Sequence, residues 1–233
     1  NNVNEEIRKD SKYNFYQINI TDRYEIRSIL RKHRITHVIH FAAQSHVDNS
    51  FNNSLQFTQD NVLGTHVLLE ESRLHGLIEK FIHVSTDEVY GGLEESSDEK
   101  IETSVLCPTN PYAATKAGAE LISQTYYHSF KFPVIITRGN NVFGKNQYPE
   151  KVIPKFISLL KDNKKITIHG NGSCIRDFIY VDDVTRAFEI IFEKGTIGQI
   201  YNIGCNDKNQ ISILELARLL IRKIKPGEDY EKW

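Results

Sequence analysis

The chain of 233 residues carries 29 basic side chains (Lys and Arg) against 30 acidic ones, and 39% of its residues are hydrophobic. That length and apolar content are enough for the core of one large α/β domain or of one and a half ordinary ones. The balanced charge excludes a global field that would attract nucleic acid or an anionic membrane, and no apolar run is long enough to span a bilayer. We therefore expect a soluble protein with neither of those partners.

The cysteines indicate the cellular compartment and whether a metal site is expected. Cys107, Cys174 and Cys205 are odd in number and widely spaced, which gives neither a disulfide framework nor the spacing of a zinc site. His46 likewise has no second His or Cys at ligand spacing. The sequence therefore predicts a reducing, cytoplasmic location and no metal site.

Two features concern the extent of the chain. It contains no methionine, and it opens on the polar stretch NNVNEEIRKDSK. These features predict a piece of a longer protein. The alternative is that methionines are missing from the written sequence, in which case some spacings below are one residue short.

Apolar runs of strand length alternate with longer segments of helical periodicity, which is the pattern of βαβ units around a parallel sheet. The first part is expected to run strand 13–18, helix 22–33, strand 37–41, helix 54–74, strand 80–85, helix 111–130 and strand 133–138. The pattern beyond Gly144 is less regular, with a helix near 150–161, strands near 166–169, 176–180 and 199–203, and helices near 182–194 and 211–224. Asp22 and Glu25 have the spacing of a capping box, and Pro111 suits a first helical turn.

These elements predict an α/β fold, a doubly wound, Rossmann-like parallel sheet over residues 1–140 followed by a smaller mixed α/β lobe over 141–233. Ligands of open parallel sheets bind beyond the carboxyl ends of the strands. The polar segments AAQSHVD, STDE and RGNN each follow one of the expected strands. One edge of the sheet is therefore the expected ligand site.

Tyr112 and Lys116 lie four residues apart at the start of the helix expected over 111–130. Residues at that spacing share a helix face, so the ammonium can sit near the phenol and favour its ionised form. Tyr112 is therefore a candidate base near neutral pH. A Tyr-x3-Lys pair also arises by chance, and a second one, Tyr127 and Lys131, is assigned to structure because it lies away from the carboxyl ends of the strands.

Asp87 and Glu88 directly follow the apolar strand at 80–85. In an extended strand neighbouring side chains point to opposite faces, so these two carboxyls do not form a proton-sharing dyad. They can reach two different atoms of one substrate if the chain turns at that point. Solvated acids in a loop are the alternative interpretation of the pair.

Small and basic residues near the same edge complete the candidate set. Ala42 and Ala43 would let a flat ligand approach the backbone, although two core alanines fit the pattern equally well. Arg138, Arg176 and Lys151 suit phosphate binding, although each residue type is also a common partner in surface ion pairs.

Several segments look like those of one known family and follow in that family's order: HFAAQSHVDNS, DNVLGTHVLLE, STDEVYG, NPYAATKAGAE, NNVFGKNQYPEKVIPKF, GNGSCIRDFIYVDDV and YNIG. Through nearly its whole length the chain thereby resembles the nucleoside-diphosphate-glucose 4,6-dehydratases, which act on dTDP- or UDP-glucose within the extended short-chain dehydrogenase/reductase family. The resemblance implies a lyase of nucleotide-sugar metabolism, serving deoxysugar (rhamnose) biosynthesis, with NAD held in a Rossmann domain.

The resemblance also implies a role for each group at the sheet edge. Tyr112, helped by Lys116, would act as base toward the sugar C4 hydroxyl, Thr86 would hydrogen-bond that oxygen, and hydride would pass from C4 to NAD. Glu88 would then remove the C5 proton, which the 4-ketone acidifies, while Asp87 protonates the departing C6 hydroxyl. Return of the hydride to C6 would complete the loss of water and regenerate the cofactor.

Binding residues and an assembly are implied in the same way. The cofactor neighbours would be Asn19, Ile20, Ala42, Ala43, Ser45, Asp60, Tyr112 and Lys116. The substrate neighbours would be Ser45, Thr86, Asn141, Lys151, Val152, His169, Arg176 and Asn206. The helices near 54–74 and 111–130 match those that pair across a homodimer as a four-helix bundle.

The chain departs from the family pattern at several positions. None of its 13 glycines forms the turn G-x-x-G-x-x-G that cradles the cofactor pyrophosphate, which the family places one βα unit earlier, and the family continues beyond EDYEKW. Asn19 stands where an Asp is usual, Asp60 where a Thr is common and His169 where a Tyr is common. We therefore expect the chain as written to hold NAD poorly or not at all, and its contacts to the cofactor and the nucleotide base to differ from the family's.

Other functions share parts of the pattern. A sugar-nucleotide 4-epimerase would share Tyr112 and Lys116 but has no use for two acids after the strand, and a decarboxylase would keep only Glu88. A catalytically silent NAD-sensing or scaffold protein need not retain Thr86, Asp87 and the other three groups together. The complete set favours the dehydratase, for either dTDP- or UDP-glucose.

Overall fold

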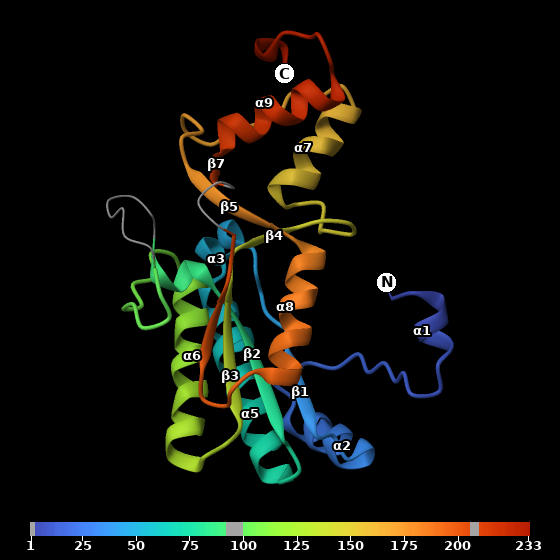
Figure 1. Cartoon of the computed structure of the whole chain (residues 1–233), viewed down its shortest axis with the longest axis vertical. Helices are drawn as coiled ribbons and strands as arrows, with labels where there is room; N and C mark the ends of the chain where they lie inside the picture. The colour runs from blue at the N-terminus through green and yellow to red at the C-terminus, as the bar shows by residue number, and fades with distance from the viewer. Residues whose placement is uncertain (1–2, 92–99, 206–209) are drawn as a thin grey trace. The chain divides into compact units, whose positions relative to one another are not determined.

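The computed structural model describes residues 3–91, 100–205 and 210–233 (Figure 1). The chain divides into two compact units, unit 1 with Asn1–Gly139 and Glu189–Asn202, and unit 2 with Asn140–Phe188 and Ile203–Trp233. The sequence places one boundary near residue 140. In the structure the chain also returns to unit 1 after that boundary, because strand β6 (Ile200–Ile203) joins the sheet of unit 1.

A four-stranded sheet with the strand order β1-β2-β3-β6 forms the centre of unit 1. Its first three strands are β1 (His37–His40), β2 (Lys80–Thr86) and β3 (Val134–Gly139). β1 pairs with β2 and β2 with β3, both in parallel, so their carboxyl ends share one edge. Helices flank this sheet (Figure 1), and the predicted Rossmann-like parallel α/β fold is confirmed.

The helices of unit 1 lie close to the predicted positions. The predicted helix at 54–74 is present as a continuous run of α4 (Ser54–Phe57), the π-helical turn η1 (Thr58–Leu63) and α5 (Gly64–His75). The other described helices of the first 139 residues are α1 (Glu5–Lys9), α2 (Arg23–His33), α3 (Val47–Asn52), the 3-10 helix η2 (Asp87–Tyr90) and α6 (Pro111–Phe130). Helix α8 (Val181–Lys194) contributes its last residues to unit 1.

Unit 2 contains a small mixed sheet in the order β4-β5-β7. Strand β4 (Asn141–Phe143) runs parallel to β5 (Ile175–Tyr180), which pairs antiparallel with β7 (Gln210–Ser212). Helix α7 (Val152–Lys161) packs against α9 (Ile213–Ile224), and the short 3-10 helix η4 (Tyr230–Lys232) follows. A capping box between Ser212 and Glu215 begins α9.

Two predicted strands do not form in the described part of the chain. Residues 13–18 have no ladder partner, and the hydroxyl of Tyr16 lies 2.6 Å from a ring nitrogen of His33 instead. Residues 166–169 also run without strand geometry. A strand needs a neighbouring backbone to satisfy its hydrogen bonds, which an apolar run alone does not supply, so both predictions were wrong.

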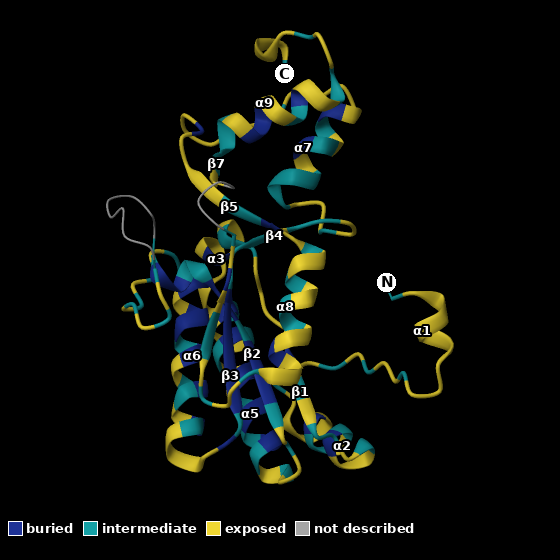
Figure 2. Ribbon diagram, viewed as in Figure 1, coloured by how far each residue is buried: buried dark blue, intermediate teal, exposed yellow. Residues whose placement is uncertain are grey.

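The hydrophobic core of unit 1 lies between the sheet and helices α2, α5 and α6, where Figure 2 shows the buried residues. Its fully buried members come from both layers: Ile26, Leu30, Leu68, Leu69, Phe81, Tyr126, Phe132, Val134 and Ile136. Burial of this apolar surface fixes the helices on the sheet and so determines where the loops at the strand ends lie.

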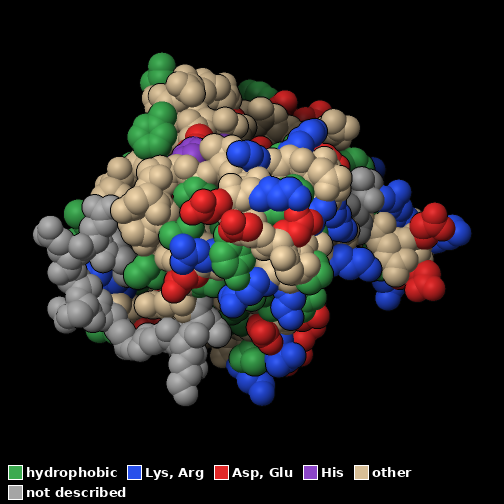
Figure 3. All heavy atoms as spheres, turned by 90° about the horizontal axis from the view of Figure 1, so that it is seen from above, with side chains coloured by type: hydrophobic (Ala, Val, Ile, Leu, Met, Phe, Trp, Pro, Cys, Tyr) green, Lys and Arg blue, Asp and Glu red, His purple; other side chains and the backbone are tan. Residues whose placement is uncertain are grey.

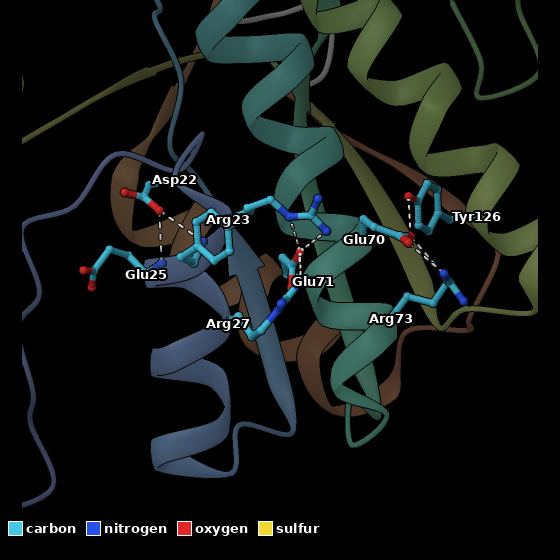
Figure 4. A network of polar contacts seen from close by, with 9 residues as sticks. Asp22, Arg23, Glu25, Arg27, Glu70, Glu71, Arg73 and Tyr126 are labelled. Carbon is cyan, nitrogen blue, oxygen red and sulfur yellow. Dashed lines mark hydrogen bonds and ion pairs between the residues drawn. The ribbon is translucent and has the colours of Figure 1, made fainter.

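A network of charged side chains fixes α2 against α5 (Figure 4). Glu71 on α5 is 2% exposed and accepts hydrogen bonds from Arg27 at 2.6 Å and from Arg23 at 2.9 Å. Its hydrogen bond with Arg27, supported by Arg23, lowers the pKa of Glu71 below its ordinary value. The buried carboxylate is thus paired on two sides, which offsets the cost of removing it from water. Beside it, Glu70 accepts from Arg73 and Tyr126.

Two histidines lie side by side in the buried centre of the sheet. His40 on β1 and His83 on β2 are in register, with ring centroids 5.5 Å apart and exposures of 3% and 0%. Burial lowers the pKa of both, to about 3 for His40, and the ammonium of Lys116 acts in the same direction. Neither ring nitrogen of His83 has a hydrogen-bond partner among the described residues. Protonating these rings therefore costs folding free energy.

Replacing His83 by Leu is expected to reduce the loss of stability at acid pH. A folded pKa below the unfolded value of about 6.5 means that the unfolded chain binds more protons, so the free energy of unfolding falls as the pH drops below that value. At about pH 5 one such histidine costs about 2 kcal/mol, which the variant does not lose. Denaturant unfolding at about pH 5 and pH 7.5 measures the difference. The same substitution at exposed His128 should leave the pH dependence unchanged, and an unchanged pH dependence in His83→Leu would contradict the account.

Candidate active site

The candidate site is built at the carboxyl end of β2, where the segment STDE leaves the sheet. Thr86 is the last residue of the strand and the N-cap of η2. Its hydroxyl accepts a hydrogen bond from the N–H of Glu88 at 3.3 Å and donates to Asp87 Oδ1 at 3.1 Å. The chain therefore turns at Asp87, which is the condition under which two neighbouring acids can face one ligand.

Position 91, at the end of this turn, requires glycine. Its φ is +93°, and a Cβ at this position would lie 2.4 Å from the carbonyl oxygen of Cys107. Any other residue would be strained and would clash with the backbone of Cys107, so the glycine fixes the end of η2.

Arg138 supports the turn through buried contacts. It is 2% exposed, forms an ion pair with Glu120 on α6 and donates to the hydroxyl of Tyr90 at 2.6 Å. The same hydroxyl donates to Asn202 at 2.7 Å. The sequence offered Arg138 as a phosphate ligand, but the structure uses its guanidinium to tie β3, α6 and η2 together.

Asn110 is the N-cap of helix α6, and its side chain reaches Glu88, one of the two acids that follow β2. The side-chain oxygen of Asn110 accepts from the N–H of Ala113 at 2.8 Å, and the hydroxyl of Ser50 accepts from the N–H of Tyr112 at 3.2 Å. Pro111 occupies the first helical position, where no N–H is needed. Two side chains thus satisfy the first N–H groups of α6 and fix the backbone that carries Tyr112.

The phenol of Tyr112 lies among the groups at the end of β2. It is 9% exposed, and Thr86, Glu88 and Asp87 are the groups that act on its pKa. Burial raises the pKa of Tyr112 above its ordinary value, and the carboxyls of Glu88 and Asp87 raise it further, while the hydrogen bond with Thr86 acts in the opposite direction. The structure thus brings these four candidate catalytic residues together.

Lys116, one helical turn further on, binds the strand backbone. Its Nζ donates to the carbonyl oxygen of Val84 at 2.6 Å, and the residue is 4% exposed. Burial lowers the pKa of Lys116 to about 8, although the charge of Glu120 acts in the opposite direction. The expectation that this ammonium lowers the pKa of Tyr112 is not met, because the ammonium faces β2 and the charges that act on the phenol are negative.

The loop after β1 is held by the π-helical turn η1. Asn61 is 1% exposed, accepts from the N–H of Gln44 at 2.7 Å, and donates to the carbonyl of Gln44 at 3.0 Å and to the hydroxyl of Thr115 at 2.9 Å. The neighbouring carboxylate of Asp60 accepts from the side-chain amides of Gln44 and Gln56. Asn61 therefore fixes the loop backbone, a role that only a three-dimensional contact reveals.

The other cofactor candidates also belong to unit 1. The side chain of Asn19 accepts from the N–H of Thr21 at 3.0 Å, and Ile20 packs against Gly64 at the start of α5. Three exposed candidates lie in the loop after β1: Ala42, Ala43 and Ser45.

The substrate candidates of unit 2 lie on its sheet, on α7 and in a loop. Asn141 is the first residue of β4, and exposed Arg176 on β5 donates to the carbonyl of Ile175 at 3.1 Å. Lys151 and Val152 form the N-terminus of α7, where the N-cap makes no side-chain capping bond. The remaining candidates are His169, which is exposed, and Asn206, which lies outside the described residues.

The described residues contain neither a membrane-spanning helix nor a cluster of metal ligands. No helix within residues 3–91, 100–205 and 210–233 is long and apolar enough to cross a membrane. Over the same residues no three His, Cys, Asp or Glu side chains are grouped so that they could hold a metal ion. Cys107, Cys174 and Cys205 form no disulfide bond within the described residues.

Comparison of the amino-acid sequence with known proteins points to one family. The family model described as GDP-mannose 4,6 dehydratase matches residues 1–230. A dTDP-D-glucose 4,6-dehydratase from Dictyostelium discoideum is 52% identical over 224 residues, which are 92% of this chain and 51% of the relative. A trifunctional UDP-glucose 4,6-dehydratase/UDP-4-keto-6-deoxy-D-glucose 3,5-epimerase/UDP-4-keto-L-rhamnose-reductase from Arabidopsis thaliana is 52% identical over 194 residues, which are 83% of this chain and 29% of the relative.

Comparison of the structure agrees with the sequence. A crystal structure of a dTDP-glucose 4,6-dehydratase from Streptomyces venezuelae with NAD bound superposes with a TM-score of 0.88 at 35% identity, covering 96% of this chain and 66% of the other. The chain thus spans about half the length of the Dictyostelium relative, 51%, and a larger share of this solved structure.

Replacing Lys116 by Met is expected to remove a cost of burying charge. Because the folded pKa of about 8 lies below the ordinary value of 10.5, the unfolded chain binds more protons between these values, and the free energy of unfolding of the wild type rises with pH across that window. The variant should lack this rise, which amounts to on the order of 3 kcal/mol. Denaturant unfolding at about pH 7.5 and pH 10 measures it. Lys131→Met, at the exposed second Tyr-x3-Lys pair, serves as the control and should keep the rise, and a rise that persists in Lys116→Met would show that the ammonium is not buried.

Proposed function

The chain belongs to the GDP-mannose 4,6-dehydratase family, and from that premise we propose that it is the catalytic part of an NAD-dependent NDP-glucose 4,6-dehydratase. Its product would be the NDP-4-keto-6-deoxyglucose. The observation that carries the proposal is the meeting of Tyr112 with Thr86, Asp87 and Glu88 at the end of β2. A relative named for dTDP-glucose and one named for UDP-glucose are each 52% identical to the chain, so the proposal covers either nucleotide.

The proposed chemistry assigns the proton transfers to three of the groups. Tyr112 takes the proton of the C4 hydroxyl while the hydroxyl of Thr86 hydrogen-bonds the same oxygen. Glu88 then removes the proton at C5, and Asp87 protonates the C6 hydroxyl, which leaves as water. When hydride adds at C6, Glu88 returns the proton to C5. The turn at Asp87 supports this division, because it lets two sequence neighbours serve two neighbouring carbons of one sugar.

NAD is the cofactor that we propose for the same edge of the sheet. When bound, it accepts the hydride from C4, returns it to C6 and, in its oxidised form, brings a positive charge. The residues present fit its nicotinamide and ribose end: Ala42 and Ala43 expose backbone after β1, Lys116 offers a buried donor, and the buried hydroxyl of Ser85 has no hydrogen-bond partner among the described residues. Burial and the charges of Glu88 and Asp87 raise the pKa of Tyr112, so the phenol would need a positive charge nearby, such as that of the oxidised cofactor, to act as a base.

The other proposed cofactor contacts come from two segments of unit 1. Asn19 and Ile20 would lie against the adenine end, and Ser45 and Asp60 would line the loop after β1, which Asn61 holds. Ser45 would also face the sugar.

Unit 2 supplies the groups that we propose for the sugar nucleotide. Backbone N–H groups at the N-terminus of α7, beside Lys151, suit a diphosphate because a helix N-terminus carries a partial positive charge. Arg176 on β5 suits bidentate phosphate binding. The remaining proposed contacts to the nucleotide are Asn141, Val152, His169 and Asn206.

Two acids beside the phenol separate this proposal from its alternatives. A 4-epimerase of the same family needs the phenol and the lysine but has no elimination step that would use Asp87 and Glu88. A decarboxylase would use Glu88 alone. A silent NAD-sensing protein has no need of any of the proton-transfer groups. The charges of both Glu88 and Asp87 act on the pKa of the Tyr112 phenol, and this supports the proposal, because loss of water needs an acid and a base beside one sugar.

The partner that we propose is a second copy of the chain. Helix α6 packs against α4, η1 and α5 within unit 1, and exposed apolar side chains occur on these elements. They include Leu55 (84% exposed), Leu63 (48%), Leu121 (54%) and Phe130 (53%). Two copies could bury these residues in a four-helix bundle.

The face shown in Figure 3 mixes acidic and basic side chains, which suits small-molecule and protein partners better than a polyanion. The cysteines of the described residues form no disulfide bond, which supports the proposal of a cytoplasmic location.

The assembly is tested by Leu121→Glu in the full-length protein. A charge at a buried interface position costs several kcal/mol, so the variant should sediment as a monomer where the wild type sediments as a dimer. Glu150→Gln, a charge change at an exposed residue outside the helices, is the control and should stay dimeric. A wild-type monomer at micromolar concentration would contradict the proposal.

The base is tested by Glu88→Gln in the full-length protein with dTDP- or UDP-glucose. The variant is expected to oxidise C4 but to lose the C5 proton at least a hundredfold more slowly, since general base catalysis contributes about that much. NADH should therefore accumulate, as seen by its absorbance, while the alkaline ultraviolet absorbance of the 4-keto-6-deoxy product stays low. Normal dehydration by this variant would assign the base to another group.

The matched variant for this experiment is Tyr112→Phe, which removes the base for the first step only. It should suppress NADH formation itself as well as product formation. Unchanged C4 oxidation in Tyr112→Phe would move that role away from the phenol.

A further inference from the structure

We propose that Asn110 is a positioning residue for Glu88, in addition to its place as the N-cap of α6. The inference rests on the dehydratase proposed above, because it concerns the carboxylate that removes the C5 proton. Neither the sequence pattern nor the family resemblance assigned Asn110 any part in the reaction.

Both ends of the Asn110 side-chain amide are used. Its oxygen accepts from the N–H of Ala113 at 2.8 Å, and its nitrogen donates to Glu88 Oε2 at 2.9 Å. A backbone N–H can only donate and a carboxylate accepts, so the two partners together fix which end of the amide is oxygen and which is nitrogen. The amide therefore has one orientation, set from two sides.

The residue type at the cap follows from the second contact. Serine, threonine and aspartate cap a helix about as well as asparagine, because capping needs only an acceptor. Among the common cap residues asparagine adds an amide donor of the right length. A purely structural cap would not need that donor, whereas a cap that also holds a carboxylate does.

This contact holds the two proposed bases, Tyr112 and Glu88, at the same helix start. Tyr112 stands two residues after Asn110, and its backbone N–H is bound by Ser50. Glu88 lies in η2, which is a separate segment, and Asn110 ties its carboxylate to the same helix start. The C4 hydroxyl and the C5 proton belong to adjacent carbons, so the phenol and the carboxylate must keep a fixed separation. Misplacement by about 1 Å can cost a hundredfold in rate.

In this proposal Glu88 carries out the proton transfer and the amide of Asn110 takes no part in it. The bond occupies Oε2, and the other carboxylate oxygen takes the proton from C5, while Asn110 neither gains nor loses a proton. Removing the amide should therefore slow elimination and leave C4 oxidation, which depends on Tyr112 and Thr86, at its normal rate.

The test is Asn110→Ser in the full-length protein. Serine keeps the capping oxygen but cannot reach Glu88, so thermal stability should change little while elimination slows at least tenfold. Stopped-flow absorbance should then show a transient rise of NADH that the wild type lacks. Asn110→Asp keeps the cap and sets a carboxylate against Glu88, and it should slow elimination further. A wild-type rate of elimination in Asn110→Ser would overturn the proposal.

Ser50→Ala is the control for a disturbed helix end. It removes the bond to the N–H of Tyr112 but leaves the contact between Asn110 and Glu88. It should lower thermal stability without a build-up of NADH during turnover. If Ser50→Ala gave the same build-up as Asn110→Ser, the effect would belong to the helix end and the proposed role of Asn110 would be wrong.

A second measurement tests the contact without turnover. In 15N-labelled protein the side-chain amide signal of Asn110 is the one that disappears in Asn110→Ser. That signal should move in Glu88→Gln, which removes the charge it binds, and should stay in place in Asp87→Asn. An unmoved signal in Glu88→Gln would refute the contact. Absence of turnover in the wild type with an Asn110 signal that moves would refute the dehydratase proposal and leave the contact standing.

Discussion

A buried ammonium bound to a strand carbonyl holds the candidate site in place. Lys116 Nζ donates to the carbonyl of Val84, two residues before the strand ends at Thr86, and so fixes the first turns of α6 against the end of β2. A lysine loses much hydration when it is buried, and its lowered pKa of about 8 records that cost. Everything at the start of α6, including the phenol of Tyr112, takes its position from this contact and from the caps before it.

Several buried polar groups contribute to the free-energy cost of this arrangement. Arg138 and Glu120 are paired inside the protein, and His83 sits in the sheet without a hydrogen-bond partner among the described residues. Apolar residues at such positions would stabilise the fold more. The concentration of buried polar groups around β2 and α6 is what a catalytic site requires, because groups that must hold or move protons need partners of fixed geometry.

The sequence contained enough to predict the sheet, the start of α6 at Asn110 and Pro111, and the emergence of Asp87 and Glu88 at the strand end. Those features follow from local periodicity and capping chemistry. It did not contain the partner of Lys116, the internal ion pair of Arg138 or the second contact of Asn110, because each depends on segments that meet only in the folded chain. The strand predicted at 13–18 failed for a related reason, since strand formation depends on a neighbouring backbone.

The account requires that oxidation at C4 and elimination across C5 and C6 occur on one sugar held at one place. The most direct measurement uses NDP-glucose that carries deuterium at C4, with the full-length protein and mass spectrometry or NMR of the product. The account predicts that the deuterium taken from C4 is found at C6 of the 4-keto-6-deoxy sugar. Deuterium that stays at C4, or that is lost to water while C6 gains ordinary hydrogen, would contradict it.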